Sequence, residues 1–380
     1  MKVGKRGNGE GSVSRRKNGG WMAQYVIYTA RGRKRRTIYG KTRTEVAGKL
    51  ATALSDREKG MVFEAGTLNV KEYLERWLSD CVRDTVKAST YSSYEQLINL
   101  HTIPTLGRIR LKTLTATHVR SLLREKLDSG LSPRTVQYIR FLLRKALDQA
   151  VADNLIPRNP VAGVKAPQVR GEEIRPLSSD QARIFLRTAA ETGNRLEALY
   201  ALAIQCGLRQ GELLALTWED VDLEARTLQV RRSLSGSSAG QPIFTTPKTA
   251  KSRRQIRLTL GATETLKRHR KHQLEERVRI AGMWQDHGLV FTTELGTPLN
   301  RHNLIQRSFK PLLNEAKLPD IRFHDLRHTC AMLLLTAGVH PKIVQELLGH
   351  STIAITLDTY SHVLPGMGDA AAGAMDEAFG

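Results

Sequence analysis

Four short segments in the second half of the 380-residue chain bring together arginine, histidine, lysine and tyrosine, side chains that can act on a phosphodiester. An arginine guanidinium stays charged and can grip two oxygens at once. Arg209 and Arg327 could therefore clamp a phosphate that gains negative charge as it reacts, and each well-placed donor would contribute about 3–4 kcal/mol. In chain order the segments cover residues 207–212, 247–249, 324–329 and 347–362.

Histidine spacing in the third segment allows two kinds of site. His324 and Arg327 are three residues apart, so they lie on one face of a helix. His328 follows His324 by four residues, and two histidines at that spacing could bind zinc. Arg327, however, would put a positive charge among the ligands, and position 325 is Asp where such zinc sites have a glutamate base. We therefore predict no metal and no cofactor.

Taken together, the four segments resemble the catalytic boxes of the tyrosine recombinase (phage integrase) family, in the family's order. The resemblance covers the whole second half of the chain. It implies an arginine and histidine set around a scissile DNA phosphate, a lysine in a β-hairpin turn that protonates the leaving 5′ oxygen, and a tyrosine nucleophile. By this resemblance the catalytic residues are Arg209, Lys248, His324, Arg327, His350 and Tyr360.

Several assignments keep an alternative. Lys251 lies close to Lys248 and could be the acid instead, because a general acid needs only to reach the leaving group. Glu212 follows the first arginine at helical spacing and is interpreted as a partner that orients its neighbours. His328 is assigned a structural role. His350, without the resemblance, would be interpreted as a helix-end histidine that bonds backbone carbonyls.

Tyr360 is the expected nucleophile, and no other tyrosine follows Tyr200. A phenol has a pKa near 10, so it needs nearby positive charge or a base to react at neutral pH. Its attack would leave a 3′-phosphotyrosyl link and a free 5′ hydroxyl. A DNA 5′ hydroxyl could then reverse the step without ATP or metal.

Charge is concentrated at the beginning of the chain. The protein has 59 Lys and Arg against 37 Asp and Glu, a net charge of +22, and residues 1–60 hold 16 basic and 4 acidic side chains. Such an excess favours a polyanionic partner, nucleic acid first. The sequence predicts strands near 21–28 and 34–39 and a helix over 42–59, which together would form a small folded domain. A solubilising basic tail is the alternative. A β-sheet can enter the major groove, and the candidate DNA-binding residues here are Arg15, Arg16, Arg33, Arg35 and Arg36.

Residues 68–155 are predicted to be all-helical. Apolar stripes indicate helices near 70–77 and 91–100, the latter ending near Pro104, and a third helix capped by Thr115 or Thr117. A fourth begins at Ser132 with proline at its first position. Two of its basic residues, Arg134 and Arg140, are further candidates for DNA binding, although a solvated basic face is an equal alternative.

The predicted fold is a multidomain α+β protein. It has a small N-terminal β-sheet-plus-helix domain, an all-helical core-binding domain, and a mixed, mainly helical catalytic domain with a small β-sheet. Four prolines between 157 and 176 disfavour helix and mark a linker. The N-terminal sheet and helix resemble the arm-type DNA-binding domain of many integrases, and the helical segment resembles the core-binding domain of the family. The expected boundaries are therefore 1–64 for an arm-type DNA-binding domain, 65–156 for a SAM-like core-binding domain, 157–176 for the linker, 177–366 for the catalytic domain and 367–380 for a C-terminal tail.

The resemblance also implies partners. It predicts a homotetramer on double-stranded DNA attachment sites of core and arm type, which exchanges strands through a Holliday junction, with a directionality factor or a DNA-bending protein as a further partner. The N-terminal domain favours integration and excision of a mobile element. The alternatives are a type IB topoisomerase and a non-enzymatic DNA-binding regulator.

Other patterns exclude some classes of protein. The three cysteines, Cys81, Cys206 and Cys330, form no CxxC pair, which argues against a disulfide framework or a cysteine zinc module. The first residues lack the apolar stretch of a signal peptide, and no run approaches the roughly 18 apolar residues of a membrane span. We therefore expect no membrane partner and a soluble, cytoplasmic protein associated with the nucleoid.

Overall fold

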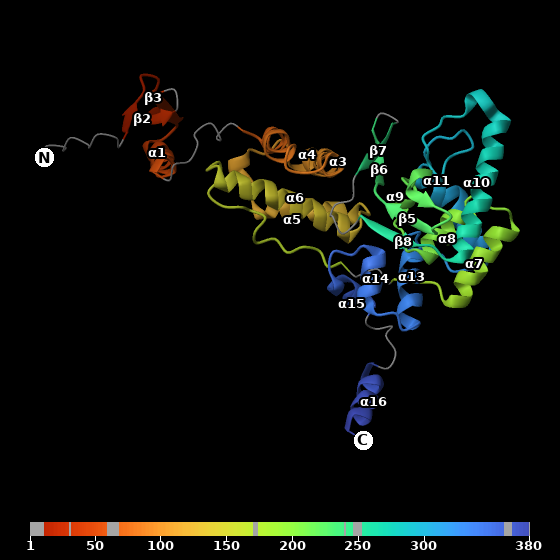
Figure 1. Cartoon of the computed structure of the whole chain (residues 1–380). Helices are drawn as coiled ribbons and strands as arrows, with labels where there is room; N and C mark the ends of the chain where they lie inside the picture. The colour runs from red at the N-terminus through yellow and green to blue at the C-terminus, as the bar shows by residue number, and fades with distance from the viewer. Residues whose placement is uncertain are drawn as a thin grey trace. The chain divides into compact units, whose positions relative to one another are not determined.

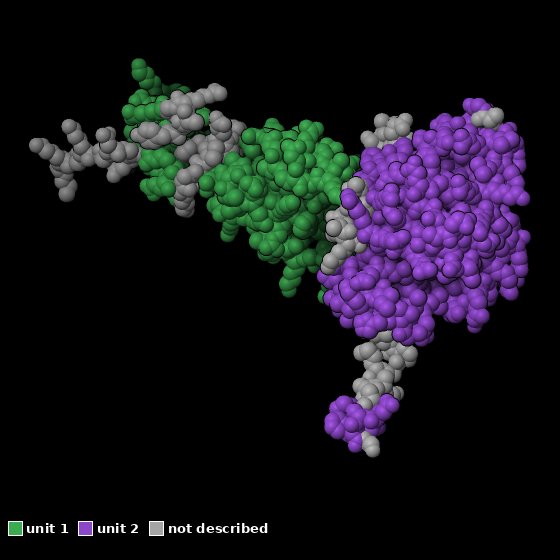
Figure 2. Space-filling model, in the orientation of Figure 1, with its two compact units in different colours: residues 1–171 green, residues 172–380 purple. Residues whose placement is uncertain are grey.

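The computed structural model describes residues 11–29, 32–58, 68–169, 174–238, 241–245, 253–360 and 367–379. The chain divides into two compact units, residues 1–171 and 172–380 (Figure 2). Figure 1 follows the element order along the chain. The described part is mainly helical, with small antiparallel sheets, as the sequence predicts.

The first unit begins with a three-stranded antiparallel sheet in the order β1-β2-β3. Alternate residues of β2 point to one face, where Ala23, Tyr25 and Ile27 are buried against Val46 and Leu50 of the following helix. This alternation matches the strand prediction, whereas β1 was not anticipated because it has only four residues and one apolar side chain. The bounds are β1 Ser12–Arg15, β2 Trp21–Thr29, β3 Gly32–Gly40 and α1 Arg43–Glu58.

A helical segment follows and has its own core. Thr115 caps α5, since its side chain accepts from the His118 backbone N–H, and Ser132 caps α6. The helical run that begins with α3 passes through a π-helical stretch, Ile98–Thr102, into α4 and ends at Leu106, close to the end predicted near Pro104. Pro104 itself occupies the first turn of α4, where a missing N–H is tolerated. The bounds are α2 Val70–Trp77, α3 Ala88–Leu97, α4 Ile103–Leu106, α5 Ala116–Asp128 and α6 Pro133–Ala152.

The helical core extends past residue 156. Val161 and Val164, which the sequence analysis placed in the linker, are buried in it. Arg140 of α6 fixes this stretch, because its Nε donates to the Val164 carbonyl at 2.6 Å.

The second unit begins with helices α7 Ser179–Glu191, α8 Glu197–Gln205 and α9 Gln210–Leu213. Strands β4 Val221–Asp222, β5 Thr227–Val230 and β8 Arg254–Arg257 form one antiparallel sheet, and β6 Ser233–Ser238 pairs with β7 Gln241–Thr245. The remaining helices are α10 Leu260–Ile280, α11 Arg301–Leu304, α12 Lys310–Glu315, α13 Asp325–Thr336, α14 Pro341–Leu348, α15 Ile353–Tyr360 and α16 Met367–Phe379.

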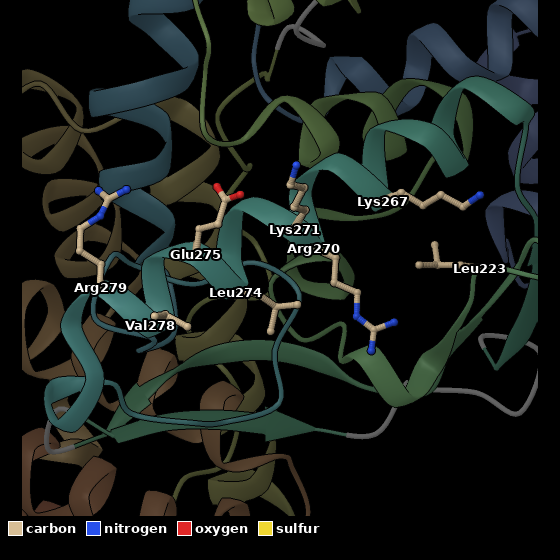
Figure 3. A pocket seen from close by; sticks show the side chains of 8 residues that line it. All are labelled: Leu223, Lys267, Arg270, Lys271, Leu274, Glu275, Val278 and Arg279. Carbon is tan, nitrogen blue, oxygen red and sulfur yellow. The ribbon is translucent and has the colours of Figure 1, made fainter.

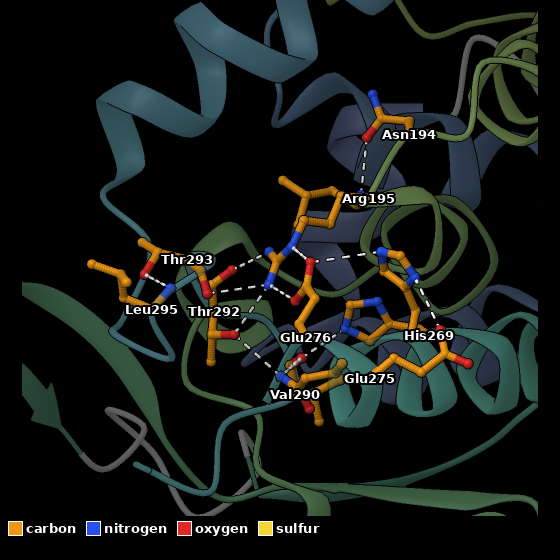
Figure 4. Close-up of polar contacts among 12 residues, drawn as sticks. Asn194, Arg195, His269, Glu275, Glu276, Val290, Thr292, Thr293 and Leu295 are labelled. Atoms are coloured by element: carbon orange, nitrogen blue, oxygen red, sulfur yellow. Dashed lines mark hydrogen bonds and ion pairs between the residues drawn. The ribbon is translucent and has the colours of Figure 1, made fainter. Parts of the chain in front are cut away.

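A polar network fastens α10 to the loop that precedes α11 (Figure 4). Arg195 forms a two-pronged ion pair with Glu276, with both N–O distances at 2.6 Å, and also donates to the Thr293 carbonyl. His269, also on α10, forms a hydrogen bond with the Val290 carbonyl of the loop. A bidentate pair of this kind adds geometric specificity, so the network holds α10 in place beside the core.

The outer face of α10 carries a shallow pocket of about 640 Å³ with basic side chains at its rim (Figure 3). Leu274 and Val278 are exposed within it, and Leu223 lies across from the helix. None of its lining residues belongs to the predicted catalytic set.

Candidate active site

The C-terminal end of α14 gathers three arginines. The last carbonyls of a helix have no partner within it and carry partial negative charge, so they attract cationic donors. In this chain the helix stops because Gly349 adopts the left-handed conformation, with φ of 67°. The carbonyls of Leu347, Leu348 and Gly349, which we call the α14 turn, each accept a hydrogen bond from a different arginine: Arg254 Nε at 2.5 Å, Arg327 Nη2 at 2.6 Å and Arg209 Nη2 at 2.9 Å.

Glu212 neutralises part of this charge. One carboxylate oxygen accepts from Arg209 Nη1 at 2.7 Å, and the other accepts from Arg254 Nη2 at 3.0 Å. Burial alone would raise the pKa of this carboxyl, but the two guanidinium groups outweigh burial and the pKa is lowered. Glu212 is therefore a buried anion that contacts two arginines, and the sequence analysis predicted for it the role of orienting its neighbours.

Arg327 is held from two sides. Its Nη1 donates to the Gly207 carbonyl at 2.7 Å, in addition to the Nη2 bond to the α14 turn, and the residue is only 2% exposed. Burial lowers the pKa of Arg327 to about 9, which leaves it charged at neutral pH. Gly207 has a φ of 62°, and a side-chain carbon there would lie 2.5 Å from Leu348. The backbone position whose carbonyl binds Arg327 therefore requires glycine.

Two histidines approach the arginines from different elements. His324 is the N-cap residue of α13, and burial together with Arg327 and Arg209 lowers its pKa. His350 directly follows the α14 turn, and its Nδ1 lies 2.9 Å from Thr356 Oγ1 of α15. Burial and the same two arginines lower the pKa of His350 to about 3, so both imidazoles are neutral at physiological pH.

Tyr360 ends α15 and is buried, with an exposed fraction of 3%. It packs in an apolar cluster that includes Ala331, Leu335 and Val344. Burial raises the pKa of the phenol to about 12, while the charge of Arg327 acts in the opposite direction. The hydroxyl lies 2.5 Å from His328 Nδ1. His328, to which the sequence analysis assigned a structural role, therefore contacts the hydroxyl oxygen of the expected nucleophile.

Five of the six predicted catalytic residues lie in this one region, on α9, α13, α15 and the turns beside them. Lys248 and its competitor Lys251 lie outside the described residues. Arg254 was missed. A signal for it exists, because it occupies the inward phase of β8: Arg254, Ile256 and Leu258 alternate, and the side chains of all three are largely buried.

Comparisons with known proteins identify the family of this chain. The phage integrase family matches residues 175–366, and the phage integrase N-terminal SAM-like domain matches residues 69–127. The chain belongs to the phage integrase family. This recombinase is 32% identical to a XerC-like tyrosine recombinase of Caldanaerobacter subterraneus subsp. tengcongensis over 87% of its own length and 88% of the relative. It is 27% identical to the ICEBs1 integrase of Bacillus subtilis over 76% and 77% of the two chains.

Solved structures share the fold of this family member. The Tn1549 transposon integrase in complex with a circular intermediate DNA covers 82% of this chain and all of its own, with 22% identity and a TM-score of 0.68. A lambda integrase tetramer bound to a Holliday junction covers 90% of this chain and 95% of its own, with 20% identity and a TM-score of 0.57.

The predicted class of function is confirmed: the chain is a site-specific tyrosine recombinase that cleaves and rejoins DNA strands. Among its described helices, none is both long and apolar enough to span a membrane.

Proposed function

We propose that Tyr360 attacks a scissile DNA phosphate that Arg209, Arg327, His324 and His350 hold. The observation that carries this proposal is the α14 turn, whose consecutive carbonyls bind Arg327 and Arg209 and whose next residue is His350. One backbone segment thus sets the spacing of two arginines and a histidine. The neutral histidines can donate hydrogen bonds to phosphate oxygens, and the arginines supply fixed positive charge.

Arg209 is the more accessible of the two clamping arginines. Its side chain is 36% exposed, whereas Arg327 lies beneath the surface. Arg209 can therefore contact a phosphate directly with the edge that its two hydrogen bonds leave open. Lys248, by resemblance, donates the proton to the 5′ oxygen as the P–O5′ bond breaks, while the Tyr360 oxygen forms the new bond to phosphorus.

A nicked suicide duplex that contains the attachment site tests this assignment. The unmodified protein should accumulate a covalent protein–DNA adduct, and Tyr360→Phe should bind the duplex without forming one, since it lacks the attacking oxygen. Tyr200→Phe is the matched control, because it also removes a phenol oxygen from the same unit. Adduct formation by Tyr360→Phe would contradict the proposal. Binding without any adduct by the unmodified protein would instead support a regulator.

The N-terminal sheet supports a second DNA contact. Cross-strand neighbours share a face, and Ala23 pairs with Ile38 on the side covered by α1. Arg33 and Arg35 therefore point to the open face, whereas Lys34 and Arg36 point to the helix side. Tyr39 is 55% exposed on the open face, and the Arg16 guanidinium lies 4.8 Å from its ring centroid. This basic and aromatic face fits a DNA groove, and we propose it as the arm-site contact.

Replacing Arg33 and Arg35 together by alanine should weaken binding to a duplex that spans the attachment site and its flanks. If each arginine neutralises one phosphate, the slope of log K against log salt should fall by about 1.8. Replacing Lys34 and Arg36 together by alanine removes the same amount of charge from the helix side. This variant should change the slope of log K against log salt less than the Arg33 and Arg35 variant does. Equal changes in the two variants would show that only bulk charge matters.

Integration and excision of a mobile element are the biological process that we propose. Relatives of this chain include integrases named for an integrative element and for a prophage. The chain would act as a homotetramer on core and arm sites, as expected from a structural relative described as a tetramer on a Holliday junction. A directionality factor or DNA-bending protein would then choose between the two reactions, and the enzyme would work at the nucleoid.

A further inference from the structure

We infer that His328 is a catalytic residue that takes the proton from Tyr360 during cleavage and returns it during religation. The inference rests on the proposed role of Tyr360 as the nucleophile. It starts from the 2.5 Å contact between His328 Nδ1 and the phenol oxygen, the atom that must lose a proton. Proton transfer requires this hydrogen-bond reach between base and donor.

The position of His328 follows from α13. It comes one residue after Arg327 and one helical turn after His324, so the helix presents a phosphate ligand and a base side by side. Tyr360 reaches it from α15, across the apolar cluster of Ala331, Leu335 and Val344. A buried hydroxyl needs a partner, and for Tyr360 the described residues supply that partner through His328.

The other histidines of the site are engaged differently. His350 Nδ1 bonds Thr356 Oγ1, and the ring of His324 stands edge-on to that of His328, with centroids 5.0 Å apart. Burial and the neighbouring His324 lower the pKa of His328 to about 4. The imidazole is therefore neutral at physiological pH, and its Nδ1 lone pair can accept the phenol proton.

The proton balance closes in both directions. During cleavage the phenol O–H bond breaks, its proton moves to Nδ1, the phenol oxygen bonds to phosphorus, and the 5′ oxygen leaves with the electron pair of its P–O bond. The resulting imidazolium is stabilised by the nearby Asp325 carboxylate. During religation a 5′ hydroxyl returns its proton to Lys248 as its oxygen bonds to phosphorus, the bond from phosphorus to the tyrosine oxygen breaks, and the phenolate regains the proton from His328.

Asparagine separates a base from a residue that merely holds Tyr360 in place. His328→Asn can still hydrogen-bond the hydroxyl but cannot accept a proton. Single-turnover cleavage of the suicide duplex by this variant should be about 100-fold slower near neutral pH. The unmodified enzyme should show a flat rate from about pH 6 to 8, whereas the variant should speed up about tenfold per pH unit as phenolate forms.

The leaving group and the neighbouring charges need control. A duplex with a 5′-bridging phosphorothiolate has a thiolate leaving group that needs no proton, so the general acid Lys248 cannot affect the dependence of the cleavage rate on pH. On this substrate His328→Asn should still cleave slowly, whereas the cleavage rate of Lys248→Ala should recover. The charged or titratable groups that face His328 also influence the measured pH–rate profile. They are His324, Asp325, Arg322, Arg327, His350 and Tyr360.

Wild-type rate and a flat profile in His328→Asn would overturn the inference while leaving the role of Tyr360 intact. Adduct formation by Tyr360→Phe would remove the proposed function itself. His328→Ala, which loses the hydrogen bond as well, measures the positioning contribution, and asparagine should restore that part alone.

Discussion

Glu212→Gln should destabilise the catalytic unit by about 3–5 kcal/mol, the usual effect of removing one partner from a buried ion pair. Glutamine keeps the shape of the side chain but not its charge. Arg209 and Arg254 would then face each other, with Arg327 nearby, and the negative charge that lies between the first two would be gone. The loss should appear as faster hydrogen exchange of backbone amides in α13 and α14.

Glu219→Gln is the matched control for this loss. Glu219 is exposed in the same unit, and its substitution should change stability by less than about 0.5 kcal/mol. A difference between the two variants below about 1 kcal/mol would mean that Glu212 does not hold the arginines together.

Arg327→Lys should reduce DNA cleavage by about 100- to 1,000-fold while the DNA still binds. Lysine keeps the charge, but a single ammonium cannot bridge the Gly207 and Leu348 carbonyls in the plane that the guanidinium uses. The positive charge would shift, and with it the geometry of the phosphate site. Single-turnover adduct formation and fluorescence anisotropy of labelled DNA measure the two quantities separately.

Arg322→Lys is the control for Arg327. Arg322 pairs with Asp325 just before α13, and its side chain is 48% exposed. Lysine keeps a positive charge beside the buried Asp325 carboxylate, and the side chain at position 322 is half-exposed, so cleavage should stay close to the unmodified rate. Equal losses in the two variants would indicate a general weakening of α13 and would contradict a specific role for Arg327.

The order of the boxes in the sequence predicted a set of candidate catalytic residues, five of which the fold brings together. Arg209, His324, Arg327, His350 and Tyr360 do lie in one region, because capping and left-handed glycines bring their elements together. Serine, threonine and proline signals predicted a helix start at Ser132 and another at Thr115 or Thr117, of which Thr115 is the cap, since these are local interactions. The helix ends at Leu106, two residues beyond Pro104, because the proline occupies the first turn of α4, where its missing N–H is tolerated.

Long-range contacts were harder to foresee. Arg254 and the α14 turn are 93 residues apart in the chain, and no local spacing links them. The same holds for His328 and Tyr360, which are 32 residues apart and meet only when α15 packs against α13. Val161 and Val164 were assigned to the linker because prolines surround them in the sequence, yet their side chains are buried in the helical core.

Identifying the amino acid that carries the DNA tests the central claim most directly. The covalent adduct from the suicide duplex would be digested with protease and nuclease, and the nucleotide-linked peptide would be sequenced by mass spectrometry. We predict a phosphate linked to Tyr360 through the 3′ end of the cleaved strand. A linkage at any other residue, or through a 5′ end, would contradict the account.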